Sequence, residues 1–482
     1  MNATLVQVED LCIHTVPNAG AHFGRALLQA CSFSLRAGER LTLVGESGAG
    51  KSLLAQAIMG TLPRALKARG SILIKGQATH GQRVATQPHW GCDVMMLPQE
   101  PGSALSSLMR MQAQVAEAAH FARSVPWRAA RQIATEQLEA LGVNHAAQQW
   151  LHQISGGMAQ RVSVACVGAA QAQLLIADEP TKGLDPMASK QVAAMLMAGQ
   201  SQGQALLTIT HDLDLAAQLG GQLMVLRQGR VVEEGDTQKV LSNPQNSYTQ
   251  ALIAAQPKHW SVYPFEPRAV DADPLIEVRQ LSHRFGGGTV FEDLSVALVP
   301  GEVLAISGSS GCGKTTLGNV MLGLIQPTAG TVHRATGLPS WKFQKLYQDP
   351  PAAFSPFQTL GQGLQAVCKL HRLSNAGQAH WMQALGLSKD LLQRLPSEVS
   401  GGELQRFALL RLMQLQPAFI FADEPTSRLD PITQRNTMQV LCEAAAQQGC
   451  AVLLVSHDAH LGRASSHRHV PMSALCAPQT TL

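Results

Sequence analysis

The chain carries one glycine-rich phrase twice, as GESGAGKS from Gly45 and as GSSGCGKT from Gly308. The lysines of the two phrases, Lys51 and Lys314, lie 263 residues apart. Two later motifs, SGG and ADEP, each recur at a separation of 245 residues. Because several separate motifs keep the same order and nearly the same spacing, the pattern indicates a duplicated domain rather than a chance match.

The repeat divides the 482 residues into two domains and a connector. The segment between the copies holds four prolines, and proline at this density breaks helices and favours an extended connector. We predict a first domain at 1–256 with a short C-terminal extension, a proline-rich linker at 257–274 and a second domain at 275–482. Pro471 argues against a central strand near the end of the second domain, so we expect a truncated C-terminal tail there.

Composition narrows the class of protein. With 45% hydrophobic and 15% charged residues the chain can bury a packed core, and a net charge of +4 is too small to argue for a nucleic-acid partner. No apolar run reaches the roughly 18 residues needed to span a bilayer, and the first residues do not resemble a secretion signal. The nine cysteines form no CxxC pair, which argues against a zinc site or a disulfide framework and favours a reducing, cytosolic compartment.

Both glycine-rich phrases match GxxxxGK[ST] and lie between a short β-type apolar run and a run of helical periodicity. Glycines let successive backbone N–H groups turn towards a phosphate, the lysine can reach the β and γ phosphates, and the last hydroxyl can bind Mg²⁺. An ordinary glycine-rich turn is the alternative, and the recurrence of the whole context argues against it. The predicted ATP-binding residues are Gly45, Glu46, Ser47, Gly48, Ala49, Gly50, Lys51 and Ser52 in the first copy, and Gly308, Ser309, Ser310, Gly311, Cys312, Gly313, Lys314 and Thr315 in the second.

An acidic pair follows a buried apolar run in each copy, as LLIADEP and FIFADEP. Ligands of open α/β sheets bind at the carboxyl ends of such strands. We therefore expect Asp178 and Asp423 to hold Mg²⁺, and Glu179 and Glu424 to act as general bases on the attacking water. The alternative, an acidic pair that only caps the next helix, is plausible for one copy but not for two.

The segments ISGGMAQR and VSGGELQR resemble the LSGGQ-type signature of ABC-type ATPases, and five kinds of motif occur in that family's order, twice. The resemblance implies an α/β fold of two tandem P-loop ATPase domains, each with a RecA-like core, an antiparallel β subdomain and a helical subdomain. It also implies that Gln99 and Gln348 are Q-loop glutamines that contact Mg²⁺, and that His211 and His457 are switch histidines.

The same resemblance implies that the two domains pair head to tail, with each ATP between the phosphate loop of one domain and the signature of the other. Both sites are then expected to hydrolyse ATP. The first site comprises Lys51, Ser52, Gln99, Asp178, Glu179 and His211 with Ser400, Gly401 and Gly402 opposite. The second comprises Lys314, Thr315, Gln348, Asp423, Glu424 and His457 with Ser155, Gly156 and Gly157 opposite.

Members of the family stack an aromatic residue on adenine, and the resemblance places that residue roughly 20 to 30 positions before the phosphate loop. Phe285 fits this place in the second copy. Counting back in the first copy gives Ala26 or Arg25, with Phe23 as a weak substitute.

The segments after the two Q-loop glutamines resemble those of ATPases that serve oligopeptide, dipeptide and nickel importers. This implies an ATPase that couples ATP, with Mg²⁺, to the import of peptides, nickel or a metal–chelator complex. Its partners would be two integral-membrane permease subunits and, through them, a solute-binding protein, with no nucleic acid. The chain would then lie at the cytoplasmic face of the inner membrane as a peripheral protein.

Two other functions remain open from the sequence. One is a soluble twin-cassette ATPase that acts on ribosomes or DNA, although such proteins usually carry long charged linkers or inserted modules that this chain lacks. The other is an exporter motor, which the importer-type Q-loop segments disfavour.

Overall fold

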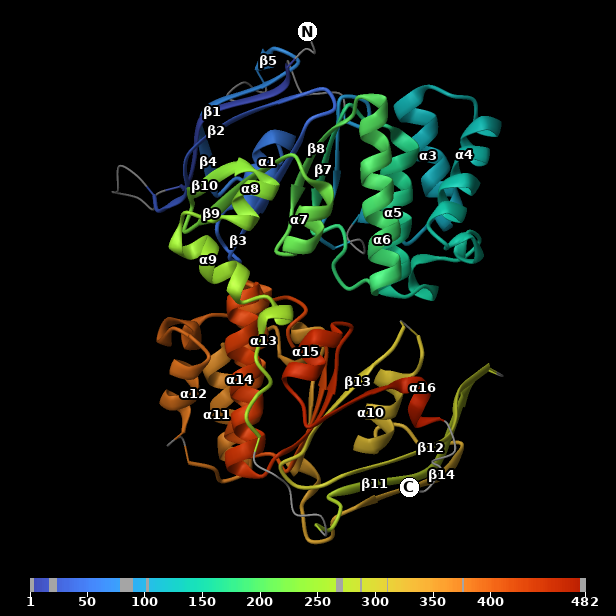
Figure 1. Cartoon of the computed structure of the whole chain (residues 1–482), viewed down its shortest axis with the longest axis vertical. Helices are drawn as coiled ribbons and strands as arrows, with labels where there is room; N and C mark the ends of the chain where they lie inside the picture. The colour runs from blue at the N-terminus through green and yellow to red at the C-terminus, as the bar shows by residue number, and fades with distance from the viewer. Residues whose placement is uncertain are drawn as a thin grey trace. The chain divides into compact units, whose positions relative to one another are not determined.

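A computed structural model describes residues 4–16, 24–78, 90–100, 104–265, 272–286, 288–309, 311–374 and 377–476. The chain folds into two compact units, Met1–Ile253 and Ala254–Leu482 (Figure 1). Each unit contains a mainly parallel sheet, a separate antiparallel sheet and a group of helices, which confirms the expected fold class. Within the described ranges, no helix has both the length and the apolar character needed to cross a membrane.

Among the described residues, the core sheet of the first unit has six strands and five pairings. Four of the pairings are parallel, and the one between β10 and β9 is antiparallel. Central strands of this sheet are buried along their whole length, as expected where helices cover both faces. In spatial order the strands are β10 (Arg230–Asp236), β9 (Gln222–Arg227), β3 (Arg40–Gly45), β8 (Ala205–Ile209), β7 (Leu174–Asp178) and β6 (Val94–Leu97).

An antiparallel sheet forms a second layer of the first unit, and its buried residues share one core cluster with helix α1 (Lys51–Met59) and strand β3. This layer therefore contacts the phosphate-loop helix directly. Its strands, in order, are β2 (Ala26–Arg36), β1 (Thr4–Thr15), β4 (Leu66–Ile74) and β5 (Gln77–Ala78).

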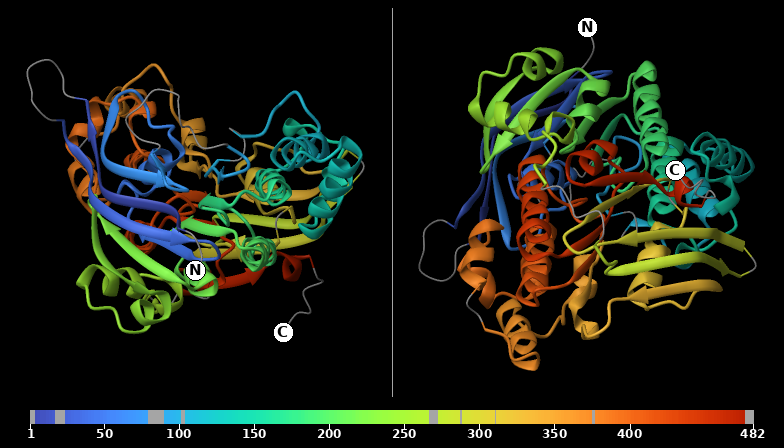
Figure 2. Two further views of the ribbon diagram at one scale, coloured as in Figure 1. Left: turned by 90° about the horizontal axis from the view of Figure 1, so that it is seen from above. Right: turned by 60° about the horizontal axis from the view of Figure 1, so that its bottom comes forward.

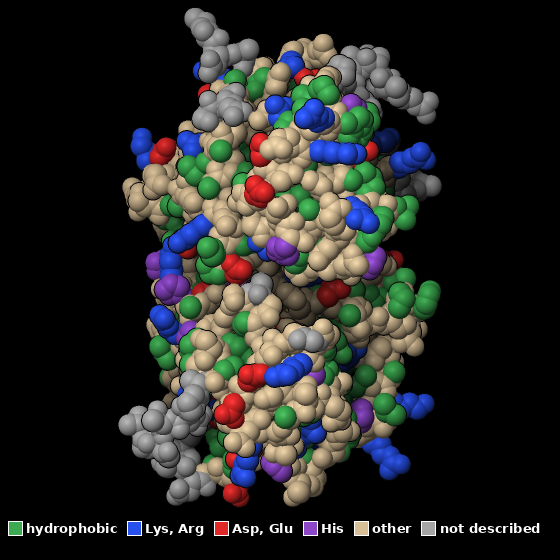
Figure 3. Space-filling view, turned by 90° about the vertical axis from the view of Figure 1, so that its right-hand side faces the viewer, with side chains coloured by type: hydrophobic (Ala, Val, Ile, Leu, Met, Phe, Trp, Pro, Cys, Tyr) green, Lys and Arg blue, Asp and Glu red, His purple; other side chains and the backbone are tan. Residues whose placement is uncertain are grey.

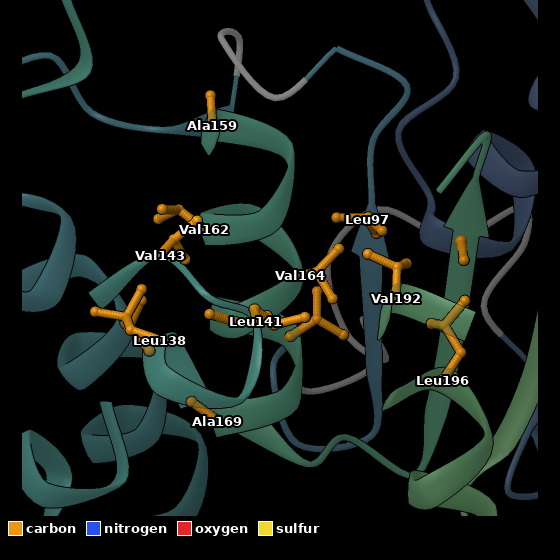
Figure 4. Packing of buried hydrophobic residues seen from close by; sticks show 14 of the residues in the cluster. Leu97, Leu138, Leu141, Val143, Ala159, Val162, Val164, Ala169, Val192 and Leu196 are labelled. Atoms are coloured by element: carbon orange, nitrogen blue, oxygen red, sulfur yellow. The ribbon is translucent and has the colours of Figure 1, made fainter. Parts of the chain in front are cut away.

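The helices of the first unit pack on the core sheet and on one another. Figure 4 shows this packing, with Leu138 of α4, Val162 and Val164 of α5 and Leu196 of α6 in one apolar cluster. Such a cluster fixes the start of α5, where the signature lies. The helices are α1 (Lys51–Met59), α3 (Met111–Arg123), α4 (Trp127–Ala140), α5 (Gly156–Ala170), α6 (Pro186–Ala198), α7 (Leu213–Leu219), α8 (Thr237–Ser242) and α9 (Ser247–Ala254).

The second unit repeats this plan with a five-stranded core sheet in which every pairing is parallel. In order its strands are β15 (Phe343–Leu346), β16 (Phe419–Asp423), β17 (Ala451–Val455), β13 (Val303–Ser307) and β18 (Arg468–Pro471). The antiparallel layer, yellow to orange in Figure 2, comprises β12 (Gly288–Leu298), β11 (Ile276–Phe285) and β14 (Ala329–Arg334). The helices are α10 (Lys314–Leu322), α11 (Leu360–Leu370), α12 (Gln378–Ala384), α13 (Gly401–Gln414), α14 (Pro431–Gln448), α15 (Ala459–Ala464) and α16 (Met472–Leu475).

Pro471 ends an edge strand and not a central one, in agreement with the expectation from the sequence. It is the last residue of β18, which lies at the edge of the sheet and pairs with β13 on one side only. Proline is tolerated at an edge because the missing N–H removes no bond of an inner ladder.

Aromatic residues of the segment expected to be the linker pack on the second unit. Trp260 and Phe265 contact its hydrophobic core cluster, and the Phe265 ring stacks on His467 with centroids 3.9 Å apart. The Tyr263 backbone N–H donates to the Ala464 carbonyl at 2.8 Å. These contacts attach residues 260–265 to the helix α15 region.

Candidate functional site

Each glycine-rich phrase forms a loop between a core strand and the helix that follows it, β3 to α1 and β13 to α10 (Figure 1). The Lys51 ammonium donates to the carbonyls of Gly45 at 2.7 Å and Glu46 at 2.8 Å. The Lys314 ammonium makes the same two contacts in its own loop, at 2.8 and 2.9 Å. Both lysines are buried, so each loop is folded round its cation and encloses positive charge. Ser310, also predicted to bind phosphate, lies outside the described residues.

Glycine is required at the last loop position of each unit. Gly50 and Gly313 have φ values of 95° and 98°, in the left-handed region that other residues rarely adopt. A Cβ would lie 3.0 Å from the Leu27 carbonyl oxygen at Gly50, and 2.6 Å from Val290 Cγ1 at Gly313. Because both neighbours belong to the antiparallel layer, that layer supports the phosphate loop from outside the core sheet.

The predicted magnesium ligands meet at the carboxyl ends of the core strands. Asp178 and Asp423 are the last residues of β7 and β16. The Thr315 hydroxyl donates to Asp423 Oδ2 at 3.0 Å, and Ser52 hydrogen-bonds Asp178 in the same way. Burial raises the pKa of Asp178 to about 6, and burial also raises the pKa of Asp423.

The Asp178 Oδ1 atom is buried and has no hydrogen-bond partner among the described residues. Buried polar atoms are normally satisfied, so this oxygen is suited to a ligand that the protein itself does not supply. A carboxylate beside a hydroxyl is an oxygen donor set of the kind that Mg²⁺ prefers. These residues therefore fit the expected metal.

The two glutamates have an unusual backbone. Glu179 and Glu424 follow the strand ends and have φ values of 52° and 51°, left-handed conformations that cost non-glycine residues free energy. Their N–H groups donate to the carbonyls of Ile209 at 2.8 Å and Val455 at 3.0 Å, which are the strand ends next to them. After this sharp turn both carboxylates lie at the carboxyl ends of the strands, near the lysine of the phosphate loop, where a base for the attacking water is needed.

Each glutamate faces the histidine of its own unit, but the two pairs differ. In the first unit His211 Nδ1 lies 2.8 Å from Glu179 Oε1. In the second unit His457 Nε2 lies 3.3 Å from Glu424 Oε1. Burial opposes ionisation of Glu179, yet the neighbouring His211 lowers the Glu179 pKa overall, and the pair raises the pKa of His211. Burial, reinforced by the charge of Asp423, instead raises the pKa of Glu424 to about 8.

A cation explains part of this difference. Lys182 lies near Asp178 and Glu179, and its charge opposes the rise that burial causes in the pKa of both carboxyl groups. At the matching position of the second unit, 245 residues later, stands the neutral Ser427. The sequence motif did not reveal this, and it also missed Thr210, whose hydroxyl donates to Glu179 Oε2 at 3.4 Å.

The Q-loop glutamines also lie at the carboxyl ends of the core strands, and their side chains are exposed. Gln99 follows β6, which pairs in parallel with β7, so it leaves the sheet beside Asp178. Gln348 follows β15 and leaves beside Asp423 in the same way. The strand pairing therefore places each glutamine near the acidic residue with which it was predicted to act.

The signature serines cap helices α5 and α13, whose main packing neighbours do not include the phosphate-loop helix of the same unit. Ser155 caps α5 by accepting from the Met158 N–H at 3.3 Å, and Ser400 caps α13 through a reciprocal pair of bonds with Glu403. The main packing neighbours of α5 are α3, α4, α6 and β6 rather than the phosphate-loop helix α1. Each unit thus brings together its loop, acidic residues and histidine, but not its signature.

Strand register corrects the expected equivalent of Phe285. Matching residues of β1 and β11 differ by 270 in residue number, whereas matching residues of β2 and β12 differ by 263. The loop between β1 and β2 is therefore seven residues longer than the loop between β11 and β12. Thr15, and not Ala26 or Arg25, therefore occupies the place of Phe285, whose ring is 55% exposed at the end of β11. Phe23 lies outside the described residues.

Comparison with known proteins agrees with this geometry. The family model described as ABC transporter matches residues 28–182 and again 291–427. The chain is 31% identical to the peptidoglycan transport ATP-binding protein YejF of Agrobacterium fabrum, over 92% of this chain and 86% of the relative. It is also 31% identical to the glutathione import ATP-binding protein GsiA of Escherichia coli K12, over 92% of this chain and 81% of the relative.

Solved structures share the fold at low sequence identity. The archaeal ribosome recycling factor aABCE1, in complex with ribosomal stalk protein aP1, has a TM-score of 0.64 and 19% identity, covering 95% of this chain and 87% of that one. A model of ribosome-bound archaeal Pelota and ABCE1 has a TM-score of 0.66 and 20% identity, covering 95% and 76%. At these identities the likeness concerns the tandem fold alone.

Proposed function

Because the chain belongs to the ABC transporter family of ATP-binding proteins, we propose that this ATPase is the energy-coupling subunit of an importer. The observation that carries the proposal is the complete set of loop lysine, strand-end aspartate, glutamate and histidine in each unit. Relatives that match over nine-tenths of the chain are named as transport or import ATP-binding proteins, which supports import over other uses of the fold.

The proposed chemistry follows from the site. The loop amides and the lysine hold the β and γ phosphates once the triphosphate displaces the lysine from its carbonyl contacts. Ser52 and Asp178, or Thr315 and Asp423, would hold Mg²⁺, which offsets phosphate charge when bound. Glu179 and Glu424 orient the attacking water and accept its proton, and the facing histidines position them.

We further propose that the two units bind ATP head to tail. A helix start with bare glycines suits a phosphate, yet in neither unit does the signature helix have the phosphate-loop helix among its main neighbours. If each signature instead contacts the ATP held by the other unit, both signatures have a phosphate to bind. A ligand that contacts both units favours a closed state by its differential affinity, and hydrolysis removes that preference.

The partners and location follow from this role. Two integral-membrane permease subunits would form the pore, the Q loops would contact them, and a solute-binding protein would deliver cargo to them. The chain would then lie on the cytoplasmic face of the inner membrane. Peptides, nickel or a metal–chelator complex are the proposed cargo classes, and the names of the relatives favour peptide-containing molecules among them.

A ribosome- or DNA-directed ATPase is the alternative function. The likeness to ribosome recycling factors is one of fold only. On the face shown in Figure 3, Lys and Arg side chains are interspersed with Asp and Glu, whereas proteins that bind nucleic acid usually gather basic residues on one face. The choice of the importer therefore rests on the names of the relatives and not on this one face.

Purification of the tagged chain from gently solubilised cells tests the proposal. We expect two multi-spanning membrane proteins to co-purify in stoichiometric amounts, and their presence in detergent to raise ATP turnover. Recovery with ribosomes or DNA, and without membrane proteins, would refute the importer role. Uptake of labelled peptides and of nickel, compared in a deletion strain, then separates the cargo classes.

A further inference from the structure

One histidine of the second unit is buried without a hydrogen-bond partner. His283 lies on β11 and is 5% exposed. Neither of its ring nitrogens has a hydrogen-bond partner among the described residues. A neutral imidazole has one nitrogen that donates and one that accepts, and burying both without partners costs free energy. Because buried polar groups are normally satisfied, this ring is suited to a ligand that the protein itself does not supply.

Packing does not require a polar residue at this position. Alternate residues of a strand share one face, and the inward face of β11 runs from the buried Leu281 through His283 to the exposed Phe285. The strand register of the first unit places Ile13 at the position that matches His283. Ile13 is fully buried in a core cluster, so an apolar side chain suits this place in the fold. The imidazole therefore needs an explanation other than packing.

Two aromatic neighbours locate His283 relative to the nucleotide site. One is Phe285, the predicted adenine-stacking residue, whose ring centroid lies 4.5 Å from that of His283 with the planes at 79°. The other is Phe291, which faces His283 across the strand pair with centroids 6.3 Å apart. Phe291 lies against the phosphate loop, because a Cβ added to Gly313 would be 3.0 Å from Phe291 Cδ1. His283 is thus a neighbour both of the residue expected to hold the base and of the ring that supports the phosphate loop.

The ribose is the part of a nucleoside triphosphate that joins the base to the phosphates. Each ribose hydroxyl can donate and accept a hydrogen bond, which matches the donor and the acceptor of a neutral imidazole. A site that hydrogen-bonds a hydroxyl of its ligand discriminates against the analogue that lacks it, because a buried polar group is then left without a partner. The ribose is therefore the group whose position and chemistry both fit His283.

We propose that His283 hydrogen-bonds a ribose hydroxyl of the nucleotide held by the second phosphate loop and thereby selects ribonucleotides at that site. All the residues that carry this inference belong to the second unit. The inference rests on the proposed stacking of the base on Phe285, and it does not depend on the importer role or on how the two units pair. The first unit has Ile13 and Thr15 at the matching positions, so the two sites differ in how they recognise the nucleoside.

Calorimetric titration of the full-length protein with ATP, 2′-deoxy-ATP and 3′-deoxy-ATP, each with Mg²⁺, tests this. The K51A/E179Q/E424Q protein suppresses hydrolysis and removes the lysine of the first phosphate loop, so the titration reports the second site. We expect at least one deoxy nucleotide to bind about 3- to 10-fold more weakly than ATP, the loss expected for one neutral hydrogen bond. H283I, which introduces the residue of the first unit, should weaken ATP by the same factor and reduce the preference for ATP over that deoxy nucleotide to less than about twofold. H283F, which keeps a ring without nitrogens, repeats the measurement if H283I folds poorly.

The preference for ATP separates ribose binding from packing, because it is a ratio measured on one protein and is unaffected by a misfolded fraction. If H283I weakens all three nucleotides equally, or leaves all three affinities unchanged, His283 does not bind the ribose and the inference is refuted. Equal binding of ATP and both deoxy nucleotides before the substitution refutes it as well. In the matched K314A/E179Q/E424Q protein, which reports the Lys51 site, H283I should change no affinity more than about twofold, and a larger change would mean that it acts through the fold. If H283I acts as expected but F285A leaves ATP binding at the second site unchanged, only the base-stacking role of Phe285 fails.

Discussion

Replacing Glu424 with glutamine should change how the stability of the second unit depends on pH. Burial and the charge of Asp423 raise the pKa of Glu424 from 4.5 to about 8 in the nucleotide-free protein. The folded state therefore keeps a proton that the unfolded chain releases above its own pKa. Wild-type stability must fall as pH rises from about 4.5 to about 8, and glutamine, which does not ionise, removes this loss.

The size of the effect follows from the shift. Each pH unit between the two pKa values costs the folded state about 1.4 kcal/mol. Between pH 5.5 and pH 8 the E424Q variant should gain about 3 kcal/mol of unfolding free energy relative to wild type. The matched change in the first unit, E179Q, should show no such gain, because the pKa of Glu179 is lowered and its ionised form stabilises the fold.

Hydrogen-exchange mass spectrometry across a urea titration measures this for one unit at a time. Peptides that cover the buried strands β16 and β17 report the second unit, and β7 and β8 report the first. Equal pH dependence of E424Q and wild type in β16 and β17 would refute the argument. An E179Q variant that gains stability like E424Q would refute the contrast between the units.

Three further predictions concern nucleotide. E179Q/E424Q should bind ATP but lose turnover by at least 100-fold, and substantial phosphate release would contradict the general-base role. S155R should weaken ATP at the Lys314 site and spare the Lys51 site, which per-half photolabelling would show; the reverse pattern would contradict head-to-tail pairing. F285A should weaken ATP binding in the second half roughly tenfold through lost base stacking, while T15A leaves the first half within twofold; equal effects in equilibrium titrations would contradict the register argument.

The fold was predictable because the motifs that identify it depend on backbone geometry. A GxxxxGK[ST] phrase needs glycine at Gly50 and Gly313 to fit under the antiparallel layer, so the letters alone imply strand, loop and helix. Asp178 and Asp423 end buried strands as their apolar runs indicated. Such features are local, and local features can be read from a sequence.

The misjudged features depend on contacts between distant segments. The residue of the first unit that corresponds to Phe285 was predicted by counting back from the phosphate loop. That count ignores the seven extra residues between β1 and β2, and strand pairing shows that the corresponding residue is Thr15. The contrast between the two glutamates arises mainly from the closer contact of His211 with Glu179, and partly from Lys182. Both effects depend on where a loop directs its side chains.

A structure of the full-length E179Q/E424Q protein with ATP and Mg²⁺ tests the central claim most directly. We expect two nucleotides, each with its γ phosphate within hydrogen-bond distance of a loop lysine from one unit and a signature serine from the other: Lys51 with Ser400, and Lys314 with Ser155. Triphosphates contacted by one unit only, with both signature serines turned to solvent, would contradict it.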